Sequence, residues 1–400
     1  MSSRRLPPFD RRDFLRGAAG ALAASGAALV GCSADPVPPV SGSAVASSSP
    51  QAPSGSIAGA PAVVPADGAR PRVPYGAQSG DVTSSSAIVW SKADRLARLV
   101  VEWDTDPRFS SPRRVEGPVA TAASDFTARV DLSGLPAGQR IHYRVVFEVP
   151  GSPAVKSEPA RGSFPTALSQ AAAGDVLFAW SGDTAGQGWG IDEARGGWII
   201  YEAIRRAQPD FFLHCGDLIY ADNPIRPEVM LRDGSTWRNV TTPAKSKVAE
   251  TLDDFRGNHA YNFLDKNVRR LAAEVPALVM WDDHEVHNNW TPSTVLDDAR
   301  YTVKECGRLM GPAKQAMFEY TPIRWTEGTE RRVYRSFSRG PSLDVFLLDE
   351  RSYRGPNTEN RQPVPGPETA MLGAALRQHL RAQPARPDLR ARGALPVPFV

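Results

Sequence analysis

Four short apolar runs in the second half of the sequence each end directly in a carboxylate, and this arrangement constrains the fold more than any other feature. The first acidic residues after these runs are Asp183, Asp217, Asp282 and Asp349. Helical patterns separate the runs, which predicts strands that alternate with helices in an α/β domain. Polar residues at the carboxyl ends of such strands meet at one edge of an open sheet, where α/β enzymes place their sites.

The α/β pattern extends over residues 174–375, and its expected elements follow from the periodicity of the apolar residues. We expect strands at residues 175–180, 211–215, 277–281 and 343–348, and helices at residues 198–206, 258–273 and 299–320.

Residues 75–166 have a different pattern, in which short apolar or alternating runs are separated by turn residues. The runs occupy residues 87–90, 97–103, 127–132 and 141–147. This spacing predicts a small β-sandwich. His142 is the single histidine of this region, and we interpret it as a structural residue of a strand.

The first residues have the features of an export signal. Arg11-Arg12 followed by Asp13-Phe14-Leu15 resembles the twin-arginine signal, and the apolar stretch 17–31 is too short and too rich in Gly and Ala for a spanning helix. Cys32 ends a lipobox-like segment and predicts a lipid anchor, although a plain signal peptide with an incidental cysteine also fits. We therefore expect the twin-arginine machinery to export the chain to the periplasm or cell envelope.

The composition of the chain indicates a disordered linker and argues against both nucleic-acid binding and a disulfide framework. Residues 33–74 are rich in Ser, Ala and Pro, with few large apolar residues, and predict a disordered linker. The net charge of +3 and the absence of a basic run with interleaved aromatics argue against nucleic-acid binding. With three cysteines in all, a disulfide framework is not indicated, and Cys215 is expected in the core.

A metal ion is the physical explanation for several carboxylates brought to one edge of a sheet. Asp183, Asp217 and Asp283 would repel one another unless a cation lay between them. With the phenol of Tyr220 the set is rich in oxygen, which favours a hard ion such as Fe(III), Ca(II) or Mn(II) over a thiolate-type zinc site. Two metals that share one aspartate would bind a phosphate and activate a hydroxide for in-line attack.

Several motifs along the chain are distinctive: GDLIY at 216–220, WDDHEVHNNW at 281–290, RGNHAYNFLD at 256–265, LLDERSYR at 347–354 and SGDVTSSSAIVWSKAD at 79–94. Together these motifs resemble the alkaline phosphatase D (PhoD-like) family of metallophosphoesterases. The resemblance implies a metallophosphoesterase-type sandwich of mixed sheets flanked by helices, preceded by a fibronectin-like β-sandwich. It also implies hydrolysis of phosphomonoesters or phosphodiesters through a metal-activated hydroxide.

The resemblance implies a role for each matching residue. Asp183 would bind the first metal, Asp217 would bridge two metals, Tyr220 would bind iron and Asp283 would bind the second metal. His284 would hydrogen-bond the leaving group or the developing charge. Arg351 would bind a phosphate oxygen, the alternative being an ion pair with Asp349 or Glu350. Iron and calcium are the metals the family implies, with manganese or zinc as further choices. Many members have a Ser-Cys pair where this chain has Ser181-Gly182-Asp183, so the identity of the metal stays open.

The C-terminal sequence departs from the family pattern. The family takes its remaining ligands from histidines near the C-terminus, whereas only His379 follows His287 in this chain. Residues 376–400 form an atypical tail rich in Arg, Ala, Pro and Leu, without a helical or strand period, and we expect a frameshift near residues 374–378. The alternative to a frameshift is a genuine, divergent short member with its own tail. Without the histidine ligands we expect little or no phosphatase activity, and the alternative function is that of a catalytically deficient, truncated homologue with a structural role or none. A β-sandwich adhesion module with an unrelated partner domain would require the four strand-end carboxylates to be coincidental.

Overall fold

The structure is a computed structural model that describes residues 67–184, 188–326, 328–359, 361–369, 371–382 and 391–395. The predicted export signal, the cysteine of the predicted lipid anchor and most of the predicted linker lie outside the described residues. Among the described residues, no helix is long and apolar enough to cross a bilayer.

The N-terminal part is a sandwich of two antiparallel layers. One layer has the order β5-β2-β1, and the other contains β4-β3-β6 with β7 and β8 paired to β6. The strands are β1 (Ala77–Gly80), β2 (Ser86–Lys92), β3 (Ala97–Asp104), β4 (Arg113–Ala120), β5 (Thr127–Ser133), β6 (Arg140–Val149), β7 (Ser152–Lys156) and β8 (Ala160–Pro165). Because side chains alternate between the faces of a strand, the inward set forms one apolar cluster between the layers, which includes Val89, Leu99 and Phe164.

One sheet continues from the sandwich into the α/β part. Its order is β5-β2-β1-β13-β10-β9, where β9 is Phe178–Ser181, β10 is Phe211–His214 and β13 is Ala277–Val279. Strands β1, β13, β10 and β9 are parallel, so their carboxyl ends face the same edge. Gly80 is required at the junction, because a Cβ there would lie 2.5 Å from the carbonyl oxygen of Ala277.

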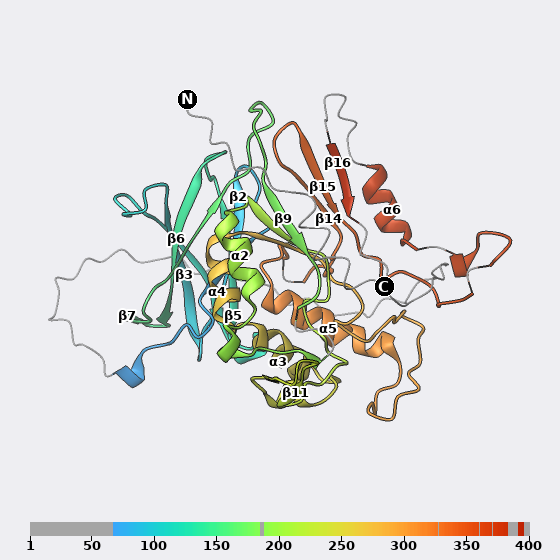
Figure 1. Cartoon of the computed structure of the whole chain (residues 1–400). Helices are drawn as coiled ribbons and strands as arrows, with labels where there is room; N and C mark the ends of the chain where they lie inside the picture. Colours follow the sequence, from blue (N-terminus) through green and yellow to red (C-terminus); the bar gives the residue numbers. More distant parts are fainter. Residues whose placement is uncertain are drawn as a thin grey trace.

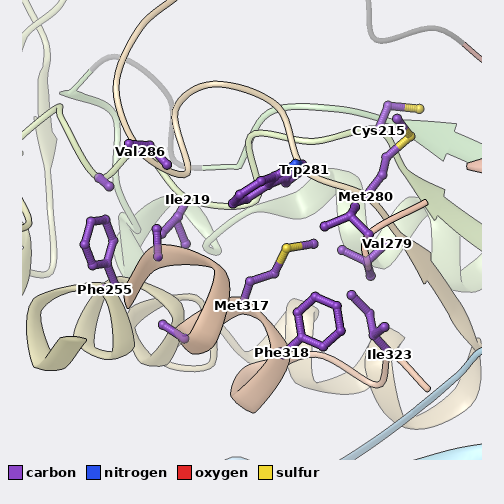
Figure 2. Packing of buried hydrophobic residues seen from close by; sticks show 14 of the residues in the cluster. Cys215, Ile219, Phe255, Val279, Met280, Trp281, Val286, Met317, Phe318 and Ile323 are labelled. Carbon is purple, nitrogen blue, oxygen red and sulfur yellow. The ribbon is translucent and has the colours of Figure 1, made fainter. Parts of the chain in front are cut away.

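Helices cover both faces of the parallel strands (Figure 1). On one face α2 (Ile199–Ala207) and α4 (Lys266–Glu274) pack through Tyr201, Leu271 and Val275 against Phe212. The opposite face contacts the larger core, to which α3 (Leu252–Asn262), α5 (Cys306–Tyr320), β14 (Arg335–Ser338) and β15 (Leu343–Leu347) contribute. Figure 2 shows Met317 of α5 pointing toward Trp281 and Met280, which follow β13.

The cysteines of the described chain behave as the sequence predicts. Cys215 and Cys306 are free and buried, and both belong to the larger core. The prediction that Cys215 is a core residue is therefore confirmed.

A short hairpin, β11 (Glu228–Met230) with β12 (Thr236–Arg238), lies outside this core.

Two predicted helices are wrong in extent. The helix expected at 258–273 is divided into α3 and α4, because the Asp265 side chain accepts the N–H groups of Asn267 and Val268 and starts a new helix. The helix expected at 299–320 begins only at Cys306. The backbone N–H groups of Thr302 and Val303 donate to the Glu250 carboxylate, at 2.6 Å each, instead of to helix carbonyls.

The expectation of a tail without regular structure is wrong for part of it. Ala374–Arg381 form α6, and Ala391–Leu395 form β16, which pairs in parallel with β15. The cause is an apolar stripe at intervals of four residues, Leu372, Leu376 and Leu380, which packs beside Tyr334 and Leu348. The three-stranded sheet β14-β15-β16 and α6 lie on the side of the molecule away from β3, β6 and β7 (Figure 1).

Candidate metal centre

Three predicted ligands follow three neighbouring parallel strands. Asp183 follows β9, Asp217 follows β10 and Asp283 follows β13. The backbones of Asp183 and Asp217 are left-handed, with φ of 61° and 53°. The two loops are joined by hydrogen bonds from Asp183 N to Gly216 O at 3.2 Å and from Thr184 N to Asp217 O at 2.7 Å. The strand ends therefore lie close together, as the pattern of the sequence predicts.

Asp217, Asp283 and His284 form one buried group of potential ligands, whereas Asp183 is exposed and lies outside this group. One ligand atom each of Asp217, Asp283 and His284 lies within 4.8 Å of the others. The Tyr220 hydroxyl donates a hydrogen bond to Asp183 Oδ1, so these two predicted ligands lie next to each other. The donors are mostly oxygens, so the group fits a hard cation.

The electrostatics of the carboxylates agree with this fit. Burial raises the pKa of Asp217, and the charges of Glu285, Asp283 and Asp282 raise it further. Burial likewise raises the pKa of Glu285 and of Asp282. Carboxyl groups that repel one another in a desolvated site gain the most from a positive ion between them.

His284 is oriented by a partner that the sequence did not indicate. Its Nδ1 lies 2.8 Å from Asp222 Oδ1, and its backbone N–H donates to Asp217 Oδ1 at 3.0 Å. The ring stacks on Tyr220, with centroids 4.1 Å apart. Burial lowers the pKa of His284, but the hydrogen bond to Asp222 and the charges of Asp222, Asp283 and Glu285 together outweigh burial, so the pKa is raised. Because Asp222 occupies Nδ1, Nε2 is the ring nitrogen left for a substrate or an ion.

Arg351 lies at the same edge, but with partners other than the expected ones. Its Nε donates to Asp282 Oδ1 at 2.5 Å, and its Nη2 lies 3.3 Å from Asp283 Oδ1. The alternative ion pair with Asp349 or Glu350 is therefore wrong. Nη1 is buried and has no hydrogen-bond partner in the described part of the chain.

Sequence reasoning missed the residues that hold the ligands in place. Asp282 and Glu285 stand inside the WDDHE motif, which we interpreted only through Asp283 and His284. Asp222 lies two residues after Tyr220, and no periodicity distinguishes it from a loop carboxylate. A sequence signal existed for the first two residues but not for Asp222.

Buried carboxylates, a phenol and an imidazole at the carboxyl edge of a parallel sheet define an α/β protein with a candidate oxygen-rich metal centre. The family model "PhoD-like phosphatase" matches residues 178–390, and the model "PhoD-like phosphatase, N-terminal domain" matches residues 58–167. The chain belongs to the PhoD-like phosphatase family, which confirms the predicted resemblance. The match includes the residues at which a frameshift was expected.

Two relatives place the chain within this family. Alkaline phosphatase D of Bacillus subtilis (strain 168) is 26% identical over 327 residues, which are 76% of this chain and 52% of the relative. A solved structure of PhoD superposes with a TM-score of 0.63 at 24% identity, over 79% of this chain and 60% of that one, and shows the same fold. The chain thus spans between half and two thirds of the length of these relatives.

Proposed function

We propose that the chain is a metal-dependent phosphoesterase that hydrolyses phosphomonoesters or phosphodiesters outside the cytoplasm. The observation that carries the proposal is the buried group of Asp217, Asp283 and His284, with the Tyr220–Asp183 pair beside it. Membership of the PhoD-like phosphatase family and the likeness to alkaline phosphatase D support a phosphate ester as the substrate.

Asp183, Tyr220, Asp217 and Asp283 would hold the metal, with Asp217 shared between two ions. Bound ions supply positive charge that polarises a phosphoryl oxygen and lowers the pKa of water. The mainly oxygen donor set favours iron, calcium or manganese, with zinc as a weaker choice.

Two further side chains would act on the substrate. His284, held through Nδ1 by Asp222, presents Nε2 as a proton donor to the leaving oxygen. Arg351 has its unpaired Nη1 available for a phosphoryl oxygen, while Asp282 and Asp283 fix the rest of the guanidinium group.

A catalytically deficient homologue is the second candidate, and one observation favours it. His379 lies in α6 with its ring 5.5 Å from that of Tyr334, and among the described residues the potential ligand group contains a single imidazole, that of His284. Imidazole is a preferred ligand of iron and zinc, so a group with one imidazole would hold these ions less strongly than a histidine-rich centre.

Metal analysis together with turnover separates the two candidates. We expect the purified chain to retain metal and Asp217→Asn to lose it. The matched control is Asp254→Asn, which changes a buried carboxylate at the start of α3 and should keep the metal. Hydrolysis of an aryl phosphate with added iron, calcium or manganese would support the enzyme. Bound metal without turnover would support the deficient homologue. Equal metal content in Asp217→Asn and the unmodified chain would contradict the metal assignment.

We also propose that the mature protein is exported and anchored through Cys32. Replacement of Arg11-Arg12 by two lysines should retain the chain in the cytoplasm, because the twin-arginine machinery reads both guanidinium groups. Cys32→Ala should instead release an exported chain from the membrane fraction. Fractionation of cells measures both effects, and unchanged export of the lysine variant would contradict the proposed route.

A further inference from the structure

Glu285 is a buried carboxylate that binds backbone rather than other side chains. It is 1% exposed. Its Oε1 accepts the N–H of Leu218 at 2.6 Å, and its Oε2 accepts the N–H groups of Asp217 at 3.2 Å and Asp282 at 2.8 Å. One side chain thus satisfies three backbone donors at the centre.

These three donors belong to two different loops. Asp217 and Leu218 follow β10, whereas Asp282 follows β13 and directly precedes the predicted ligand Asp283. Asp217 has a left-handed backbone, which costs a residue with a side chain about 1–2 kcal/mol. The hydrogen bond from the Asp217 N–H to Glu285 Oε2 stabilises that conformation. The Glu285 carboxylate therefore sets the backbone positions from which Asp217 and Asp283 extend.

Glu285 is not arranged as a ligand itself. Both of its oxygens already accept backbone hydrogen bonds, and the group of potential ligands within 4.8 Å consists of Asp217, Asp283 and His284 without it. A residue that holds ligand-bearing loops in place can change metal affinity by one or two orders of magnitude without contact to the ion.

We propose that Glu285 is a positioning residue that fixes the separation of Asp217 and Asp283 and thereby sets the metal affinity of the centre. This inference rests on the metal site of the proposed function. A carboxylate that stabilised only the fold would change the stability of the chain and leave its metal affinity unchanged.

The test measures Mn²⁺ binding to the full, metal-stripped chain by the electron paramagnetic resonance signal of free Mn²⁺, with urea unfolding of each variant alongside. In Glu285→Gln the amide NH₂ replaces one acceptor, so one loop loses its anchor. We expect binding to weaken about 10- to 100-fold. The matched control is Glu319→Gln, which removes a buried carboxylate of α5 that binds Arg256, at 2.7 and 2.9 Å, and no loop of the centre. It should lose stability and keep its Mn²⁺ affinity.

Glu285→Asp separates geometry from charge. It keeps the negative charge but is one methylene shorter and cannot reach both loops, so we expect it to bind Mn²⁺ weakly as well. This variant also carries the test if Glu285→Gln fails to fold. Binding equal to that of the unmodified chain in Glu285→Asp would overturn the proposal, because charge alone would then be sufficient. Failure of the unmodified chain to bind Mn²⁺, iron, Ca²⁺ or Zn²⁺ would refute the metal site of the proposed function, and this inference with it.

Discussion

His259 should make the stability of this protein depend on pH in the mildly acidic range. It lies in α3, is 2% exposed and lines a cavity of about 80 Å³ between the sheet and the helices. Its Nε2 has no hydrogen-bond partner among the described residues, and its ring stacks on Tyr320. Burial lowers its pKa from 6.5 to about 3, and the charge of Lys245 contributes further.

The sign and size of the effect follow from this shift. The unfolded chain takes up a proton at His259 below pH 6.5, whereas the folded chain does so only near pH 3. The stabilisation is therefore complete above pH 6.5 and is lost progressively as the pH falls toward 3. Between pH 7.5 and pH 5.0 this residue alone should lower the free energy of unfolding by about 2 kcal/mol.

The perturbation is His259→Leu, which removes the titrating group and fills similar space. Urea unfolding at pH 7.5 and pH 5.0, with a chelator present, gives the free energy of unfolding of each variant. The unmodified chain should lose about 2 kcal/mol more than His259→Leu over this range. His142→Gln, which removes a half-exposed histidine of β6, should follow the unmodified chain more closely. Equal losses in His259→Leu and the unmodified chain would refute the reasoning.

Two further predictions concern the backbone and the ion pairs. Asp81 is fully buried and accepts three hydrogen bonds from Arg335. Asp81→Asn should therefore lower the free energy of unfolding, measured by urea denaturation, by about 3 kcal/mol. Gly216 has a φ of 106°, and a Cβ there would lie 2.6 Å from the backbone nitrogen of Asp282. Gly216→Ala should therefore lose both stability and Mn²⁺ binding, whereas Gly134→Ala, also at positive φ but with open space around it, should keep the binding.

The sequence was informative where local pattern determines position. Apolar runs that end in Asp183, Asp217 and the pair Asp282-Asp283 predict one shared sheet edge, because parallel strands point the same way. Contacts between distant loops leave no such pattern. Asp222 and His284 are 62 positions apart, and their hydrogen bond depends on how two loops fold over the edge. The boundary between α3 and α4 was missed for a similar reason. An Asp inside a helical pattern of apolar residues acts as an N-cap only where one helix ends and the next begins, and the pattern alone does not show this.

The arrangement of the sheet makes the sandwich a part of the centre's support. Strand β1 lies beside β13, the strand that leads to Asp283, so β13 is an interior strand with partners on both sides. The side chains of Gln78 and Trp90 donate to the carbonyl oxygens of Tyr320 and Glu319 at the end of α5, which connects the same layer to the larger core. Without the sandwich, β13 would have an open edge and the end of α5 would lose buried hydrogen bonds. The separation of Asp217 and Asp283 therefore depends on the sandwich as well as on Glu285.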